Sequence, residues 1–127
     1  MALEEDSAAA APGDTRRMTN DDLRLLQAVG SEIDVPAGAL LIERGQPGTG
    51  LFVILEGSVI VEAPEGVRRL GAGAVVGERA LVPGSGKRTA RVRTTSDVRV
   101  LAVPRGEVDR LTDEHSSLAD RIAAAGA

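Results

Sequence analysis

Hydrophobic and polar positions alternate between Val35 and Val103, and turn-forming residues interrupt the alternation at short intervals. A period of two is typical of strands with one buried face. The segments that show it are "LLIE" at 40–43, "LFVILE" at 51–56, "SVIVEA" at 58–63, "VRRL" at 67–70, "TARVR" at 89–93 and "VRVLAV" at 98–103. Turns with Gly and Pro separate them, such as those at 36–38, 46–50 and 83–86. The pattern predicts a mainly β fold, which we expect to be a jelly-roll β-roll, that is a double-stranded β-helix.

The period becomes helical on both sides of this region. Leu23 and Leu26 recur at helical spacing after the candidate caps Thr19 and Asn20, and Gly30 ends the pattern. After Pro104, "RGEVDRLTDE" and "HSSLADRIAAA" each place two apolar residues on one helical face. In the second of these segments, Ser117 and Asp120 have the spacing of a capping box. We therefore expect short N- and C-terminal α-helices to flank the β-roll.

Residues 1–17 differ from the rest of the chain, because they are mostly Ala, acidic and small residues that bury little apolar surface. We expect them to form a disordered tail. The 127 residues leave room for one domain beside such a tail, and we place this domain at 18–127.

Composition excludes several classes of site. The chain has no Cys, so it cannot form disulfides or thiolate metal sites, and its single His, His115, cannot make an imidazole cluster. A net charge of −4 disfavours direct DNA binding. Phe52 is the single aromatic residue, which leaves no set of rings for stacking bases of single-stranded nucleic acid.

The apolar runs are also too short to span a bilayer, since "LFVIL" is among the longest. The N-terminus "MALEEDSAAAAPGD" carries acidic residues where a secretory signal carries basic ones. We expect a cytoplasmic protein without a membrane segment.

Basic residues gather in "AVVGERALVPGSGKRTARVR" at 74–93, beside glycines and prolines, and this combination suggests a phosphate site. A P-loop is excluded, because Gly86 and Lys87 are followed by Arg88 rather than by Ser or Thr. A dinucleotide fingerprint is excluded as well, since "GAGAVVG" has three residues between its second and third glycines.

A third arrangement fits the spacing. "GERAL" can form about one helical turn whose free N–H groups can donate hydrogen bonds to an anion. Arg88, followed by Thr89 and Ala90 at the start of a strand, can approach the same anion, while Glu78 accepts a hydrogen bond from a neighbouring hydroxyl. A phosphate beside a sugar hydroxyl indicates a nucleotide.

These segments resemble, in order, the cyclic nucleotide-binding domains of catabolite-activator-like regulators, cyclic-nucleotide-dependent kinases and cyclic-nucleotide-gated channels. "VPAGALLIERGQPGTGLFVILEG" looks like the opening strands of that family, with Gly38, Gly45 and Gly57 at its turns. "LGAGAVVGERAL" followed by "KRTARV" looks like its phosphate-binding cassette. The resemblance covers residues 19–123.

The resemblance implies a ligand site. Glu78 would bind the ribose 2′-hydroxyl and Arg88 would pair with the cyclic phosphate. The remaining contacts would come from Gly77, Arg79, Ala80, Thr89 and Ala90. A cyclic phosphodiester carries one negative charge, so one Arg and a helix start can neutralise it, and we expect neither a metal nor a cofactor.

The chain also departs from the family pattern. Val76 stands where the family usually has an aromatic residue, Arg79 stands where it often has an apolar one, and "VPGSGK" lengthens the cassette loop. Thr89 is compatible with guanine but also occurs in domains that respond to the adenine nucleotide. We expect cAMP rather than cGMP as the ligand.

The resulting hypothesis is a non-enzymatic cyclic nucleotide sensor. Ligand would move the C-terminal helices and so regulate a partner protein, either an effector or a second copy in a homodimer. The alternative is an interaction or scaffold module that keeps the fold without the ligand. A cupin-like enzyme would need metal ligands that the chain does not supply.

Overall fold

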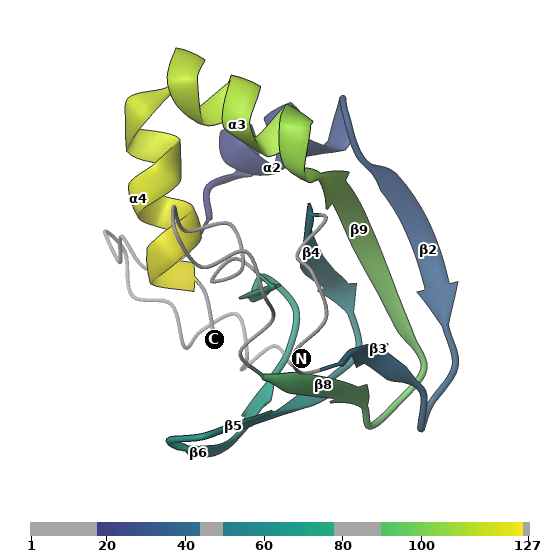
Figure 1. Cartoon of the computed structure of the whole chain (residues 1–127). Coiled ribbons are helices and arrows are strands. Elements are labelled where there is room, and N and C mark those ends of the chain that lie inside the picture. Colours follow the sequence, from purple (N-terminus) through teal and green to yellow (C-terminus); the bar gives the residue numbers. More distant parts are fainter. Residues whose placement is uncertain (1–17, 44–49, 78–89, 126–127) are drawn as a thin grey trace.

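The computed structural model describes residues 18–43, 50–77 and 90–125, which form two antiparallel sheets and a layer of helices (Figure 1). The first sheet has the order β2-β9-β4-β7 and the second has the order β3-β8-β5-β6. The strands of the first sheet are β2 (Ser31–Val35), β4 (Gly50–Glu56), β7 (Val75–Val76) and β9 (Val98–Pro104). Those of the second are β3 (Leu40–Ile42), β5 (Val59–Ala63), β6 (Gly66–Leu70) and β8 (Arg91–Thr94). The helices are α2 (Asn20–Gln27), α3 (Arg105–Glu114) and α4 (Ser116–Ala125).

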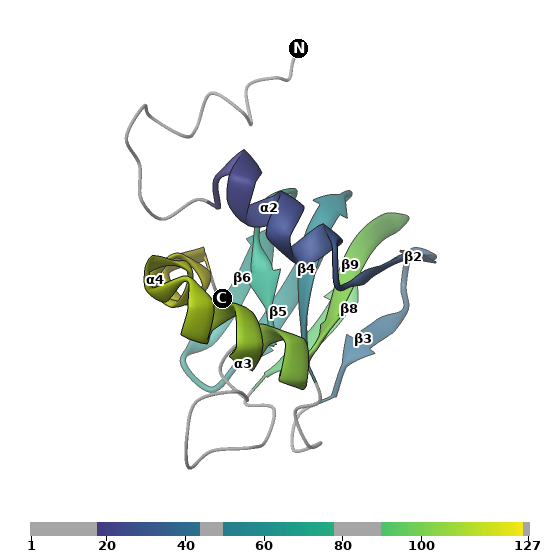
Figure 2. The ribbon, with the colours of Figure 1, turned by 90° about the horizontal axis from the view of Figure 1, so that it is seen from above.

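This architecture confirms the expected β-roll with flanking helices. Strands that neighbour each other in a sheet are mostly distant in sequence, as when β4 pairs with β9 and β5 pairs with β8. Figure 2, seen from above, shows the three helices on one side of the strands. No helix in the described ranges is long and apolar enough to cross a membrane.

Strands β4 and β9 are buried on both of their faces, and they separate two cores. Val53 opposes Leu101, and the next pair along the strands, Ile54 and Val100, points to the other face. All four of these side chains are buried. A strand covered on both sides reads as a continuous apolar run, as "LFVIL" does.

The helix-facing cluster fills the space between the first sheet and the helices. Its buried members are Leu26, Leu51, Val53, Val75, Leu101, Val103, Val108, Leu111, Leu118 and Ile122. The roll-interior cluster lies between the two sheets. Its buried members are Ile42, Ile54, Val59, Val61, Val76, Val92, Val98 and Val100.

Helix α2 begins at a capping box. The Thr19 hydroxyl accepts a hydrogen bond from the Asp22 backbone N–H at 3.0 Å, and the Asp22 carboxylate accepts one from the Thr19 backbone N–H at 3.0 Å. These two bonds satisfy N–H groups that the first helical turn leaves without partners. Thr19 is thus the cap, and Asn20 is the first helical residue.

The two C-terminal helices are confirmed, but the cap predicted at Ser117 is wrong. Helix α4 begins at Ser116, so Ser117 lies inside the helix. His115 separates the helices and has φ −132°, and its N–H donates to the Leu111 carbonyl at 2.8 Å. The chain therefore turns at His115.

Two strands were absent from the prediction. Among the described strands, β2 pairs only with β9, and its side chains are exposed or half-buried, so no buried stripe marks it. Strand β7 has two residues, Val75 and Val76, and both are buried because they face different clusters. Strand β7 is too short to show alternation, and in β2 Ile33 and Val35 alternate with Glu32 and Asp34 without forming a buried face.

The expected turn glycines are confirmed where the structure describes them. Gly57 has φ +93°, and a Cβ there would lie 2.4 Å from the Asp97 carbonyl oxygen, so only Gly fits at this turn between β4 and β5. Gly38 has φ +80°. Gly45 and the turn segments at 46–49 and 83–86 lie outside the described residues, as does the tail predicted at 1–17.

Candidate functional site

The structure describes both ends of the predicted nucleotide site. Gly77 directly follows β7, and Ala90 directly precedes β8. The residues between them, including the helical turn predicted after Gly77, lie outside the described ranges. The predicted ligand residues in that part are Glu78, Arg79, Ala80, Arg88 and Thr89.

Gly77 is held at the edge of the first sheet. The turn before β7 is fixed to β4, because the Gly73 N–H donates to the Ile54 carbonyl at 2.8 Å and the Ile54 N–H donates to the Ala74 carbonyl at 2.9 Å. Gly77 then adopts φ +90°, a conformation that L side chains rarely enter. The backbone conformation at the start of the cassette therefore requires glycine.

Ala90 is held by the second sheet. It is half-buried and packs against the roll-interior cluster, and β8 behind it pairs with both β3 and β5. Gly77 and Ala90 thus belong to different sheets. The segment that joins them connects the edge of the first sheet to a central strand of the second.

Arg91 and Arg93 alternate with Val92, which is buried, so they share the outer face of β8. Arg91 forms an ion pair with Glu43 at 3.1 Å, and this pair joins the start of β8 to the residue after β3. Arg93 lies opposite Ile60 in the register. Neither residue is on the face that lines the roll interior.

Arg68, on β6, is a candidate that the sequence did not reveal. It lies opposite Val61, which in turn lies opposite Val92, and both valines are buried in the roll interior. Directly opposed residues share one face of an antiparallel sheet, so Arg68 is on the inner face, at the exposed edge strand. The pairing register was needed to separate Arg68 from Arg69, which is on the outer face opposite Ile60.

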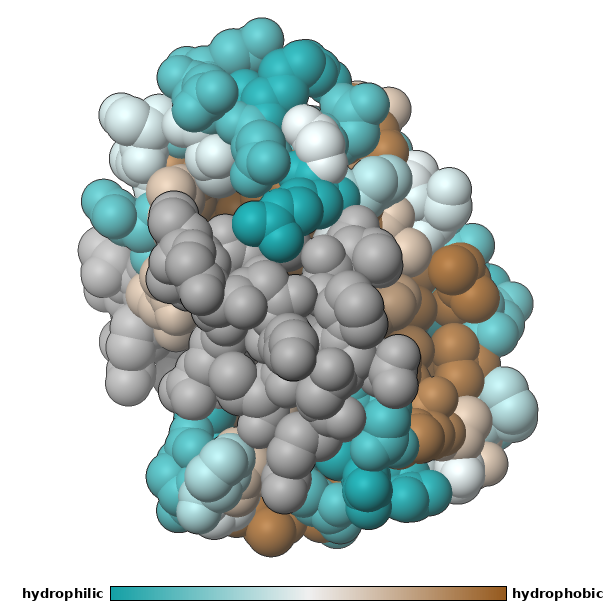
Figure 3. Space-filling model, in the orientation of Figure 1, coloured by the Kyte–Doolittle hydropathy of each residue, from teal (hydrophilic) through white to brown (hydrophobic). Residues whose placement is uncertain are grey.

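An apolar groove of about 320 Å³ runs over β2, β9 and β4. Phe52 and Ala102 oppose each other in it, and Phe52 also opposes Val76, the residue before Gly77. Figure 3 shows hydrophobic surface to the right of the grey residues, on the side where Figure 1 draws β9 and β2. Apolar surface therefore continues from the edge of the cassette across the inner face of this sheet.

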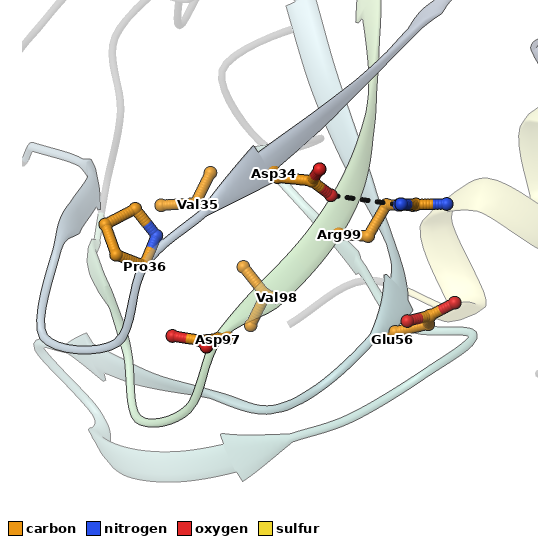
Figure 4. Close-up of a pocket in the computed structure, with 7 residues that line it drawn as sticks. All are labelled: Asp34, Val35, Pro36, Glu56, Asp97, Val98 and Arg99. Carbon is orange, nitrogen blue, oxygen red and sulfur yellow. Dashed lines mark hydrogen bonds and ion pairs between the residues drawn. The ribbon is translucent and has the colours of Figure 1, made fainter.

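A pocket of about 460 Å³ lies at the other end of the first sheet (Figure 4). Its lining residues are Asp34, Val35, Pro36, Glu56, Asp97, Val98 and Arg99. Arg99 is the cation in this lining, and its Nε donates to Asp34 at 2.9 Å. With three carboxylates around one paired guanidinium, the pocket repels an anionic phosphate. It is not a second nucleotide site.

The part of the chain that the structure describes offers no set of side chains that could bind a metal ion. Among residues 18–43, 50–77 and 90–125 there is no group of three or more His, Cys, Asp or Glu side chains that could hold a metal ion. The described geometry therefore offers surfaces for binding: an inner face with a cation, an apolar groove, and the two anchored ends of the cassette.

Comparison with known proteins identifies the family of this chain. The sequence profile described as "Cyclic nucleotide-binding domain" matches residues 32–115. A cyclic nucleotide-gated potassium channel of Rhizobium etli is 35% identical over 88 residues, which is 69% of this chain and 24% of the channel. The chain thus spans about a quarter of the length of the curated channels that it matches.

Solved structures agree with this match. One, from work on a cyclic-GMP-dependent signalling pathway that regulates bacterial phytopathogenesis, superposes with a TM-score of 0.73 at 28% identity and covers 84% of this chain and 89% of that one. The catabolite activator protein of Thermus thermophilus has the same fold, with a TM-score of 0.70 at 24% identity over 84% of this chain and 53% of that one. The chain belongs to the cyclic nucleotide-binding domain family.

Proposed function

We propose that this chain is a non-enzymatic cyclic nucleotide sensor. It binds cAMP at the cassette between Gly77 and Ala90 and regulates a partner protein in the cytoplasm by moving its C-terminal helices. In the cassette, Glu78 holds the ribose 2′-hydroxyl and Arg88 pairs with the cyclic phosphate. Further contacts come from Gly77, Arg79, Ala80, Thr89 and Ala90.

One observation carries the link between ligand and helices. In β7, Val76 is buried in the roll-interior cluster, while Val75 is buried in the helix-facing cluster together with Leu118 and Ile122 of α4. The residue after Val76 is Gly77, where the cassette begins. A displacement of the cassette therefore acts on β7, and β7 is packed directly into the core that positions α4.

Isothermal titration calorimetry with cAMP, cGMP and AMP tests the ligand site. Arg88→Ala removes a charged hydrogen bond to the phosphate, which is worth about 1.5–3 kcal/mol, so affinity should fall by about 10- to 100-fold. Arg93→Ala is the matched control. It removes a nearby Arg from the outer face of β8, so binding should be unchanged.

The results have distinct meanings. Equal affinity in Arg88→Ala and the wild type would disprove the site. Absence of binding of any of the three nucleotides at millimolar concentration would favour the alternative, a scaffold module that keeps the fold without the ligand. A bound nucleotide at 100 times its dissociation constant should stabilise the domain by about 2.7 kcal/mol, which thermal unfolding would detect.

A second candidate ligand, cGMP, is favoured by the position of Arg68. A guanidinium can donate two hydrogen bonds to O6 and N7 of guanine, whereas adenine presents an amino donor in place of O6. Arg68 is on the inner face, exposed, at the edge of the second sheet. If cGMP is the ligand, Arg68→Ala should weaken cGMP binding and leave cAMP binding unchanged, with Arg69→Ala on the outer face as control.

The proposal includes a partner protein that responds to the sensor. An effector protein or a second copy of this chain would read the position of the C-terminal helices, and we expect no direct contact with DNA because the net charge is −4. The matched channel contains a region similar to this chain within a much longer protein. Size-exclusion chromatography with light scattering, with and without cAMP, would separate a homodimer from a monomer that needs an effector.

A further inference from the structure

The first and last helices of the described chain are joined by an ion pair between a buried carboxylate and an Arg side chain that is 26% exposed. Asp22 of α2 is 2% exposed, and its two carboxylate oxygens accept hydrogen bonds from Arg121 of α4, from Nε at 2.5 Å and from Nη2 at 2.6 Å. The Thr19 N–H donates to the same carboxylate. Two parallel N–H···O bonds fix the orientation of the Arg side chain as well as its distance.

Both helices also bury side chains in the same apolar cluster. Leu26 of α2 is fully buried in the helix-facing cluster with Leu118 and Ile122 of α4. Asp22 lies one helical turn before Leu26, and Arg121 directly precedes Ile122. The ion pair therefore lies next, along each helix, to a residue that is buried in the helix-facing cluster.

The other helical ion pairs of the described residues are different. Arg24 and Asp21 are three residues apart on α2, with side chains 75% and 88% exposed. Arg110 pairs with Glu107 and Glu114 within α3, and all three side chains are more than a third exposed. Exposed pairs within one helix contribute little to stability, and they join no two elements.

The Asp22 carboxyl is held in its charged form. Burial acts to raise its pKa, but the hydrogen bonds from Arg121 and Thr19 outweigh burial and lower the pKa below its usual value. The hydrogen bond to Asp22 also raises the pKa of Arg121. Removal of the Arg121 cation while the helices stay packed would leave a carboxylate that is 2% exposed without its partner, which costs more than the loss of an exposed pair.

We propose that Asp22 and Arg121 form a clasp that makes α2 and α4 move as one unit. Its mechanical part needs no ligand. Its signalling part rests on the proposed function: if cyclic nucleotide shifts α4, the clasp transmits that shift to α2, so the N-terminal helix is part of the output surface. The surface that a partner binds would then consist of α2 and α4 together.

Hydrogen exchange of backbone amides in the full chain without ligand tests the clasp. In Arg121→Gln, exchange in both α2 and α4 should rise on the order of tenfold to hundredfold, because a buried charge loses its partner. In the matched control Arg110→Gln, which breaks an exposed pair on α3, exchange in α2 and α4 should stay at the wild-type rate. If α2 exchanges at the wild-type rate in Arg121→Gln, the clasp is disproved.

A second variant covers the case in which Arg121→Gln does not fold. Asp22→Asn combined with Arg121→Gln removes the unpaired charge, and the double variant should fold with α2 and α4 exchanging independently. If the double variant is also unfolded, Arg121 acts on something other than Asp22 and the clasp is wrong.

Addition of cAMP separates this inference from the proposed function. In the wild type, protection should change in α2 together with α4, and in the double variant it should change in α4 alone. If cAMP does not bind, the proposed function fails while the ligand-free result still stands. If cAMP binds and α4 responds without α2 in the wild type, the clasp fails and the sensor remains.

Discussion

The two faces of the first sheet differ in the side chains that they bury. Toward the helices, five of the ten buried members of the cluster are leucines, and a charged pair closes its edge. Toward the second sheet, the buried members among the described residues are all Val and Ile. Strands β4 and β9 contribute to both cores, so the difference lies in what each face is packed against.

This difference matches two separate tasks. Branching at Cβ restricts χ1, so Val and Ile give a stiff interior between two sheets that are also fixed by backbone hydrogen bonds. Leu side chains have more rotamer freedom at χ1, and here they pack against helices that form no hydrogen-bonded ladder with the sheet. The roll interior is thus the frame next to Gly77 and Ala90, and we expect repacking on the helix-facing side.

The largest effect is expected in the frame. Ile54 is fully buried between the sheets, so Ile54→Ala should leave a cavity and lower the free energy of unfolding by about 2–5 kcal/mol. Urea denaturation measures it. Val67→Ala, at a position 62% exposed on β6, is the control and should change stability by less than about 0.5 kcal/mol. Equal effects in the two variants would contradict the distinction between frame and surface.

On the helix side, a similar deletion should act locally. Leu118 is fully buried, and Leu118→Ala should lower the stability of α4 by about 2–4 kcal/mol. Because α4 has no strand ladder, its amides should exchange faster while those of β5 and β8 keep their protection. Hydrogen exchange read by mass spectrometry resolves the two regions. A uniform loss of protection would show that the two faces form one cooperative unit.

A smaller effect is expected where the frame meets the cassette. Gly77 has φ +90°, so Gly77→Ala should cost about 1–2 kcal/mol of strain. Gly106 of α3 lacks positive φ and has open space around its Cα, so Gly106→Ala should stabilise the protein by about 0.5–1 kcal/mol. Thermal unfolding of both variants gives the opposite signs directly. A shift of the same sign would rule out conformational strain at Gly77.

The smallest effect is expected from titration of Asp22, because burial offsets part of what its hydrogen bonds contribute. Its pKa is lower in the folded state than in the unfolded chain. Its contribution to stability is therefore complete above the unfolded pKa of about 4 and is lost as the pH falls through the folded pKa. Urea unfolding between pH 2 and 7 should show a shallower loss of stability on the acid side in Asp22→Asn than in the wild type.

The sequence predicted the β-roll because its strands differ clearly in period from its helices, and the predicted helices at both ends are present. It could not predict β7, since two consecutive valines buried on opposite faces give no alternation. It also missed the pairing of Asp22 with Arg121 and the inner position of Arg68. The ion pair joins segments that are far apart in sequence, and the face on which Arg68 lies depends on the register of β6 with β5; no local pattern encodes either.

The candidate site was predictable to a different extent. Spacing indicated the cassette, and the structure places its ends, Gly77 and Ala90, on two different sheets. The ligand roles of Glu78, Arg79, Ala80, Arg88 and Thr89 stay predictions, because these residues lie outside the described ranges. The positive φ of Gly77 was not predicted from the sequence and comes from the described backbone.

The clasp between α2 and α4 also has a consequence for synthesis of the chain. Asp22 and Arg121 are 99 positions apart, so a ribosome must release the whole segment from 22 to 121 before they can meet. Until then, the leucine-rich side of the nascent sheet stays uncovered. Chaperone capture during translation should therefore persist until the last helix emerges, and a chain stalled before residue 116 should be the aggregation-prone species.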